Sequence, residues 1–241
     1  MNTNLNPRFF VVIHTVAKHC SGLEHVIEQA QIAELCGADG VFLIPDYAKG
    51  QGIKASTEEQ LLYAKELLRQ GPPKLKVGVN FFMKNMAGIA PQLYELQPDF
   101  IQTDEKSLIG VDRAQLPTTE FFCGVAFKYS LYENLTGESL RTHVKEVARM
   151  CDVPTTSGVG TGCPAPISKI HEVTSYLPEG KRFAVASGVD SSNVEAYLRQ
   201  GVTDFLVATS LRHHIDDEHR DIINERAICV LAEKIHSYQL V

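Results

Sequence analysis

The sequence predicts an α/β protein folded as a single (β/α)8 barrel, the TIM-barrel class. Short apolar segments alternate with segments of helical periodicity along the chain, eight such pairs follow one another, and no linker or low-complexity segment interrupts them. This alternation is typical of a parallel sheet, and eight units of this length close it into a barrel. An open doubly wound sheet is the alternative, but the GxGxxG motif that usually follows its first strand is missing. The whole chain, residues 1–241, is therefore expected to form one barrel domain.

The first two units have clear boundaries. The first strand is expected at residues 9–13, a continuous apolar run of the kind that is buried on both faces of a sheet. Apolar residues then recur at helical spacing over residues 23–35. The second strand is expected at residues 41–44. Thr57 is expected to cap the next helix, with Gln60 as its capping-box partner.

The later units follow the same pattern. The third strand is expected at residues 76–80, where Gly78 indicates a close approach inside the barrel. A helix over residues 86–96 and a fourth strand at 99–102 come next, and only weak helical periodicity follows that strand. The remaining strands are expected at residues 121–126, 153–157, 183–186 and 205–208. Among the helices after them are residues 139–150 and a last helix over about 217–238.

Composition and charge argue against nucleic-acid and membrane partners. The net charge of −6 argues against a nucleic-acid-binding or anionic-membrane surface, since both favour basic patches. No apolar run approaches the roughly 20 residues of a membrane-spanning helix, so no membrane insertion is expected. Residues 1–7 lack the basic and apolar regions of a signal peptide, and the cysteines lack metal-finger spacing, so a cytoplasmic location is expected. Barrels of this size often form homo-oligomers, but no residue identifies an interface or a cofactor.

Polar residues follow the predicted strands at the end where the active sites of such barrels lie. Asp46 and Asp104 suit proton transfer, and Asn80 suits recognition of a hydroxyl or carbonyl group. His14 suits a general base or an orienting donor. Lys128 suits a fixed positive charge for an anionic substrate, or a Schiff base. These five form the expected catalytic set, while loop hydrogen bonds, caps and an Asp104–Lys128 salt bridge are the structural alternatives.

The last three strand-to-helix turns are rich in glycine and hydroxyl groups. Glycines allow the main chain to approach an anion closely, and hydroxyls at the starts of helices add donors. Ordinary helix capping explains any one of these turns, but three together predict a phosphate site at one end of the sheet. The expected phosphate-binding residues are Gly160, Thr161, Gly162, Ser187, Gly188, Thr209 and Ser210.

No metal site is predicted. His213 and His214 precede the charged run 216–220, but their spacing matches no recognised ligand pattern. Acidic residues in the first turn of a helix explain the run more simply.

The chain resembles the BtpA-like family of phosphate-binding-type barrels. The most specific part of the resemblance is the Ser-Gly-x-Gly-Thr-Gly segment within residues 156–162. The other segments that carry it are 37–41, 78–80, 98–101, 187–189 and 207–211. The resemblance implies a ribulose-phosphate-binding-type barrel with a polar mouth, but little specific chemistry. Asp46 stands where a Glu-Asn-like pair is expected, so no catalytic role at that position is implied by the family.

Three functions are consistent with the sequence. The first is an enzyme acting on a small phosphorylated metabolite, a sugar phosphate or a nucleotide-like compound, by isomerase, lyase or phosphoribosyl-transfer chemistry. The second is a non-catalytic accessory or assembly factor that retains the barrel and its anion pocket. The third is a metal-dependent hydrolase that uses His14 and Asp46.

Overall fold

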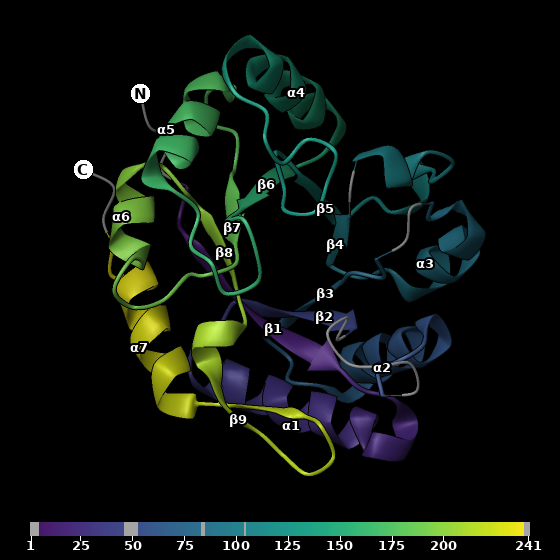
Figure 1. Ribbon diagram of the computed structural model, residues 1–241. Helices are drawn as coiled ribbons and strands as arrows, with labels where there is room; N and C mark the ends of the chain where they lie inside the picture. Colours follow the sequence, from purple (N-terminus) through teal and green to yellow (C-terminus); the bar gives the residue numbers. More distant parts are fainter. Residues whose placement is uncertain (1–4, 46–52, 83–84, 104, 239–241) are drawn as a thin grey trace.

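A closed barrel of eight parallel strands forms the centre of the molecule, with helices around its outside (Figure 1). The computed structural model describes residues 5–45, 53–82, 85–103 and 105–238. The strands follow one another around the barrel in sequence order and each pairs in parallel with the next, which confirms the predicted (β/α)8 fold. Their bounds are β1 Arg8–Thr15, β2 Gly40–Pro45, β3 Lys76–Val79, β4 Phe100–Thr103, β5 Glu120–Gly124, β6 Val153–Ser157, β7 Ala184–Ala186 and β8 Asp204–Val207.

Helices connect successive strands and pack their apolar sides on the barrel. The α-helices are α1 Gly22–Leu35, α2 Thr57–Gln70, α3 Ala90–Leu96, α4 Gly137–Met150, α5 Ile167–Tyr176, α6 Val194–Arg199 and α7 Glu225–His236. The 3-10 helices are η1 Lys18–Cys20, η2 Ala87–Ile89, η3 Glu105–Leu108, η4 Arg113–Gln115 and η5 Thr209–Leu211. The weak periodicity after β4 corresponds to η3 and η4. Within the described part of the chain, no helix has the length and apolar character that a membrane crossing needs.

The cap of α2 lies one residue before its predicted place. Ser56, not Thr57, is the N-cap, and it forms a reciprocal capping box with Glu59. Both pairs fit the sequence pattern of this motif, which therefore does not distinguish them. Gln60, the predicted capping partner, is instead fully buried, and its amide group donates to the carbonyl oxygens of Leu43 and Asn80 at 3.0 and 2.6 Å. It thus ties together the ends of β2 and β3.

The predicted helix over 217–238 is wrong in its first third. A hairpin, β9 Arg212–Ile215 and β10 Asp221–Ile223, comes after η5, and α7 begins only at Glu225. The acidic residues that suggested a first helical turn lie in the hairpin turn. There the Asp216 carboxylate accepts from the backbone N–H groups of Glu218 and Arg220 at 3.0 and 2.9 Å, a local pattern that favours a turn over a helix.

A layer of aromatic rings fills the barrel interior toward the amino-terminal ends of the strands. Alternate side chains of a strand point to opposite faces, so one set from each strand points inward. Phe10, Phe42, Phe100 and Phe122 meet there with ring centroids 5.0 to 5.8 Å apart, mostly edge to face. Such pairs add to the free energy of apolar burial, and the layer makes this end of the barrel a packed core.

The Arg8 guanidinium covers this layer at the amino-terminal end of the barrel. It lies 5.4 to 5.9 Å from the ring centroids of Phe10, Phe100 and Phe122. Its Nη1 and Nη2 donate to the two carboxylate oxygens of Glu120 at 2.9 and 2.8 Å, and its Nε donates to Asp204 at 2.5 Å. One cation therefore links β1, β5 and β8 across the barrel.

Gly78→Ala is expected to destabilise the protein by about 1–3 kcal/mol, because a Cβ atom at residue 78 would overpack the interior. That atom would lie only 2.6 Å from the Phe42 ring, which its aromatic neighbours hold in place. Denaturant unfolding measures the effect. Gly88→Ala is the matched control, since a Cβ atom there meets nothing within 4 Å. Equal stability of the two variants would contradict the close approach that the sequence predicted at Gly78.

Candidate active site at the barrel mouth

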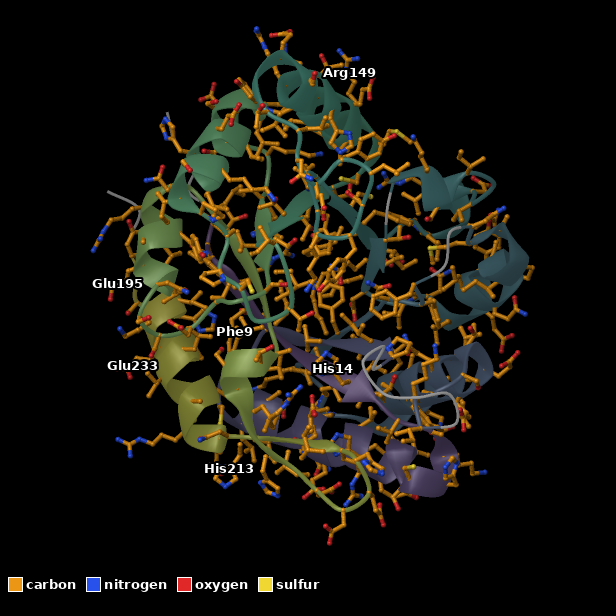
Figure 2. The ribbon with its side chains drawn as sticks, in the orientation of Figure 1. Phe9, His14, Arg149, Glu195, His213 and Glu233 are labelled. Carbon is orange, nitrogen blue, oxygen red and sulfur yellow. The ribbon has the colours of Figure 1, made fainter. Side chains whose placement is uncertain are left out.

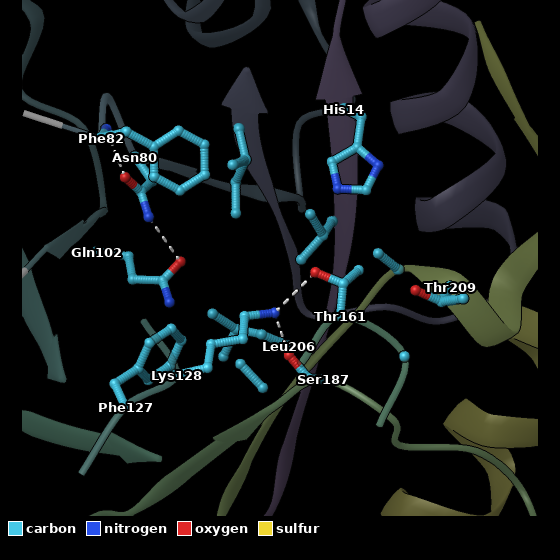
Figure 3. A pocket seen from close by; sticks show the side chains of 15 residues that line it. His14, Asn80, Phe82, Gln102, Phe127, Lys128, Thr161, Ser187, Leu206 and Thr209 are labelled. Atoms are coloured by element: carbon cyan, nitrogen blue, oxygen red, sulfur yellow. Dashed lines mark hydrogen bonds between the residues drawn. The ribbon is translucent and has the colours of Figure 1, made fainter. Parts of the chain in front are cut away.

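A pocket opens at the carboxyl ends of the strands, above the aromatic layer (Figure 3). Its floor is apolar, formed by Val12, Ile44, Ala186 and Leu206 from four different strands. Polar groups line its walls, and the space between protein atoms is about 560 Å³, part of it open to solvent. A mostly apolar concavity with a few converging polar groups is the usual form of a small-molecule site.

Lys128 reaches into this pocket from the segment after β5. Its Nζ donates to Oγ of Ser187 at 2.5 Å and to Oγ1 of Thr161 at 3.3 Å, two groups that come from the loops after β7 and β6 (Figure 3). Burial lowers the pKa of Lys128 below its ordinary value, and only the nearby Cys163 acts in the opposite direction. Among the described residues no acidic side chain forms an ion pair with it. The pocket thus contains a partly desolvated cation beside two hydroxyl groups.

The loops after β6 and β7 pack tightly against each other next to these hydroxyls. Gly188 has φ +63°, and a Cβ atom there would lie 2.2 Å from the backbone nitrogen of Pro164. Only glycine fits this contact, because both the left-handed backbone and the lack of space exclude a side chain. The adjacent Asn193 amide donates to the Gly188 carbonyl at 2.7 Å. Thr161 and Ser187 are therefore held by one rigid unit.

Several residues without the freedom of glycine adopt left-handed backbone at the mouth. Phe82 and Ser187, both of which line the pocket, have φ values of 50° and 80°, and Ala126 beside Lys128 has 43°. Such conformations cost free energy and persist where the surroundings enforce them, often at functional sites. Lys169 of α5 supplies one such restraint, since its Nζ donates to the carbonyl oxygens of Ala126 and Ser157 at 2.6 and 2.8 Å.

A pair of amide side chains forms the opposite wall. The Nδ2 group of Asn80 donates to Oε1 of Gln102 at 3.2 Å, and Oδ1 of Asn80 accepts from the backbone N–H of Phe82 at 2.8 Å. These bonds fix the Asn80 amide and leave the Gln102 NH2 group directed toward the pocket (Figure 3). The wall can thus offer neutral hydrogen-bond donors to a hydroxyl or carbonyl group.

His14 stands at the edge of the pocket and is 8% exposed. It follows Phe10 and Val12 on the inward-facing side of β1, so its ring lies at the pocket inside the barrel rather than against the helices (Figure 3). Its Nδ1 lies 2.7 Å from Oδ2 of Asp221, and Nη2 of Arg212 donates to the same oxygen at 2.7 Å. Burial by itself raises the pKa of Asp221, but the contacts with His14 and Arg212 outweigh it and hold this pKa at about 2.

Acid is expected to weaken the fold through Asp221. Its pKa in the folded protein, about 2, lies below its ordinary value of 3.8, so its contribution is fully present above pH 3.8 and is lost as the pH falls through 2. The contribution is on the order of 2 kcal/mol. Denaturant unfolding of the wild type and Asp221→Asn across this window checks it. The difference between the two proteins should shrink as the pH falls, and a constant difference would contradict the assignment.

The structure brings most of the predicted site residues into one pocket and leaves others outside it. The residues that line the pocket are His14, Asn80, Lys128, Thr161, Gly162, Ser187 and Thr209. Gly188 packs under Pro164, and the Ser210 hydroxyl donates to the Val189 carbonyl at 2.5 Å. Gly160 is likewise not part of the lining. Asp46 and Asp104 lie outside the described residues, so their predicted roles remain predictions.

Four residues in or around the site were not among the site residues that the sequence predicted. Gln60 and Gln102 are buried amides inside the barrel, and glutamine has no pattern that distinguishes a buried position from a surface one. Lys169 precedes the buried Ile170 on α5, and a lysine next to the apolar side of a helix is the sequence feature that could have indicated a role inside the protein. Asp221 lay within the supposed last helix. Among the described residues, no group of three or more His, Cys, Asp or Glu side chains is arranged to hold a metal ion.

No protein-family model matches the chain. No curated protein matches it either. Solved structures match it over nearly its whole length at low identity. Phosphoribosyl anthranilate isomerase from Thermus thermophilus has a TM-score of 0.65 at 15% identity and covers 95% of this chain and 98% of its own.

Two further solved structures are similar to this chain over nearly its whole length. Orotidine 5'-phosphate decarboxylase from Pyrococcus horikoshii has a TM-score of 0.65 at 10% identity, over 95% of this chain and 100% of its own. Thiamine phosphate pyrophosphorylase from Pyrococcus furiosus has a TM-score of 0.60 at 14% identity, over 97% and 99%. At these identities the likeness establishes the (β/α)8 fold and nothing finer.

Proposed function

We propose that this protein is an enzyme acting on a small phosphorylated metabolite, a sugar phosphate or a nucleotide-like compound, at the mouth of the barrel. The observation that carries this proposal is the position of Lys128, whose Nζ contacts the hydroxyls of Thr161 and Ser187 from two successive loops. A phosphate group would accept hydrogen bonds from these donors and supply the negative charge that Lys128 lacks among the described residues. Gly162 and Thr209 line the same side of the pocket.

Two further considerations support the phosphate assignment. Burial of the Lys128 ammonium is unfavourable unless a negative charge compensates it, and a bound phosphate would do so. The three similar structures are enzymes whose names each specify a phosphorylated compound, and their fold is the fold of this chain. Gly160, Gly188 and Ser210 would then shape the phosphate-binding loops from behind.

The rest of the expected catalytic set belongs to this proposal. His14 and Asn80 would face the part of the substrate beyond the phosphate, and Asp46 and Asp104 are proposed for proton transfer. Isomerase, lyase and phosphoribosyl-transfer chemistry all fit such a set. The resemblance to BtpA-like proteins is also part of the proposal, and it leaves a non-catalytic accessory role as the competing outcome of the test.

Thermal unfolding with paired compounds tests the proposal. Ribose 5-phosphate is compared with ribose, and adenosine monophosphate with adenosine, at matched ionic strength. A compound present at about 100 times its dissociation constant adds roughly 2.7 kcal/mol, which raises the unfolding temperature by about 5–10 °C for a chain of this size.

Stabilisation by the phosphorylated member of a pair, followed by its turnover in phosphorus NMR, is the expected result. Stabilisation without turnover across a broad panel of phosphorylated metabolites would favour the accessory role. No stabilisation by any of these compounds or by inorganic phosphate would overturn the phosphate assignment.

A further inference from the structure

The β9–β10 hairpin is fixed to the barrel at both of its ends. The backbone N–H of Ile223 donates to Oε1 of Gln29 on α1 at 3.0 Å. The backbone N–H of Asn224 donates to the Leu211 carbonyl at 2.6 Å, and the Asn224 side chain caps α7. In the antiparallel ladder Ile223 pairs with Arg212 and Asp221 pairs with Ile215. These contacts define where the Asp221 carboxylate lies relative to β1, and its residue is only 7% exposed.

The ionised Asp221 carboxylate determines which tautomer His14 adopts. At a pKa of about 2 this carboxylate carries no proton near neutral pH, so it can only accept hydrogen bonds. The Nδ1 atom of His14, 2.7 Å from Oδ2 of Asp221, must therefore carry the proton that they share. In the neutral ring this leaves Nε2 as an acceptor, and Figure 3 shows the ring nitrogen that is farther from the backbone turned toward the pocket.

Arg212 completes this arrangement. Its Nη2 donates to the same Oδ2 atom at 2.7 Å, so a second charged contact holds the carboxylate beside His14. Arg212 and Asp221 both belong to the hairpin, whereas His14 belongs to the barrel. A histidine whose Nδ1–H is held by a fixed carboxylate has a defined ring orientation and a stabilised imidazolium form, which is what proton transfer at Nε2 requires.

We propose that His14 is the general acid–base of this site and that Asp221 of the β9–β10 hairpin is its positioning residue. The inference rests on the proposed function, which it deepens by assigning the proton-transfer step. Nε2 of His14 takes a proton from a carbon or hydroxyl oxygen of the phosphorylated substrate, and the electron pair of the broken bond stays on the substrate. The imidazolium that forms is stabilised by Asp221, and it returns the proton later in the cycle.

Lys128 complements this step from another side of the pocket. Its ammonium group lies in the same pocket as the His14 ring, so a substrate whose phosphate is held by Lys128 would extend toward Nε2 of His14 (Figure 3). The substrate class is therefore a phosphorylated sugar or related compound whose reaction begins with proton abstraction. Isomerisation and elimination both begin in this way.

Nitrogen NMR of the ring nitrogens tests the positioning directly and needs no substrate. The wild-type protein, labelled with ¹⁵N-histidine, is expected to show the Nδ1–H tautomer at His14. Asp221→Asn is expected to lose this preference, because an asparagine amide can donate to Nδ1 as well as accept from it. His213→Gln is the matched control, since this exposed histidine belongs to the same hairpin. It should leave the His14 signals unchanged.

Kinetics with the phosphorylated sugars that the protein turns over tests the catalytic role. His14→Gln is expected to lower kcat by about 100-fold or more, and Asp221→Asn by about tenfold or more, both with little change in KM. Both variants should keep the stabilisation by inorganic phosphate, which reports on Lys128 and not on His14.

The outcomes separate this inference from the function that it rests on. Phosphate stabilisation together with an Nε2–H tautomer in the wild type, or with an unchanged kcat in His14→Gln, would overturn the acid–base assignment and leave the phosphate site in place. If inorganic phosphate stabilises neither the wild type nor any variant, the phosphate site itself would be overturned. If Asp221→Asn fails to fold, the wild-type tautomer and the His14→Gln kinetics still decide the question.

Discussion

Lys128→Met is expected to abolish the stabilisation by inorganic phosphate while leaving the protein at least as stable as the wild type. The loss of binding follows from removing the cation that would face the phosphate. Truncating a buried, hydrogen-bonded charge that contacts its ligand costs about 2–5 kcal/mol, so the dissociation constant for phosphate should rise about 100-fold.

The stability of this variant follows from the sign of the pKa shift. The pKa of Lys128 in the folded protein is lower than in the unfolded chain, because burial disfavours the charged form. Below that pKa the buried charge therefore opposes folding, and methionine removes this penalty. A group kept at a cost in stability is typical of binding sites, where function and stability are in conflict.

Thermal unfolding with and without inorganic phosphate measures both effects. Lys145→Met is the matched control, because Lys145 lies exposed on α4. It should keep the phosphate response. A Lys128→Met protein that is still stabilised by phosphate to the wild-type extent would contradict the assignment, whatever its stability.

Arg8→Met is expected to destabilise the fold by about 3 kcal/mol or more, the largest stability effect predicted for this chain. The carboxylate of Asp204 is completely buried and receives the Nε–H of Arg8 at 2.5 Å. Without Arg8 the side-chain partners that it keeps among residues 5–45, 53–82, 85–103 and 105–238 are Arg182, at 3.2 Å, and the neighbouring threonine hydroxyl. Breaking a buried ion pair on one side leaves an uncompensated charge, which is why the expected loss is large.

The choice of methionine isolates this charge effect. A methionine side chain has a similar length and still covers the aromatic rings, so little packing is lost. Denaturant unfolding gives the free-energy difference, and Arg149→Met is the control, because Arg149 extends into solvent at the end of α4 (Figure 2). A loss below about 1 kcal/mol for Arg8→Met would show that the contacts of Asp204 with Arg182 and Thr203 are sufficient.

The barrel could be predicted because buried parallel strands are nearly continuous apolar runs, and most of the eight strands have this character, although β6 is Val-Pro-Thr-Thr-Ser. β1 and β2 were predicted within two residues at each end. The β9–β10 hairpin could not be predicted from the sequence. Its acidic turn has the composition of a first helical turn, and in β10 only Ile222 and Ile223 indicate a strand. Local composition does not distinguish a helical first turn from a hairpin turn. The contact that holds the hairpin residue Asp221 on the barrel is with His14, 207 residues away in the sequence, and a local pattern does not reveal such a contact.

Site residues at the ends of strands could be predicted from the sequence. Site residues that reach the pocket from a helix or a hairpin could not. His14 lies at the carboxyl end of β1, and Asn80 and Lys128 follow β3 and β5, so the alignment of strand ends predicted that they would share the mouth. Asp221 reaches the same pocket edge from a hairpin, and Lys169 supports it from a helix. No rule of the barrel fold determines such positions.

The Arg8 cluster and the aromatic layer beneath the pocket share no residue with the pocket lining. A buried ion-pair cluster and a packed aromatic layer thus lie at the end of the barrel opposite the proposed site. Substitutions of pocket-lining side chains that leave these groups intact are therefore expected to cost little stability, which favours divergence toward new substrates during evolution. For the same reason the barrel is a suitable scaffold for engineering, in which pocket-lining positions of the loops after β5 to β8 are randomised while β1 and Gly188 are left intact.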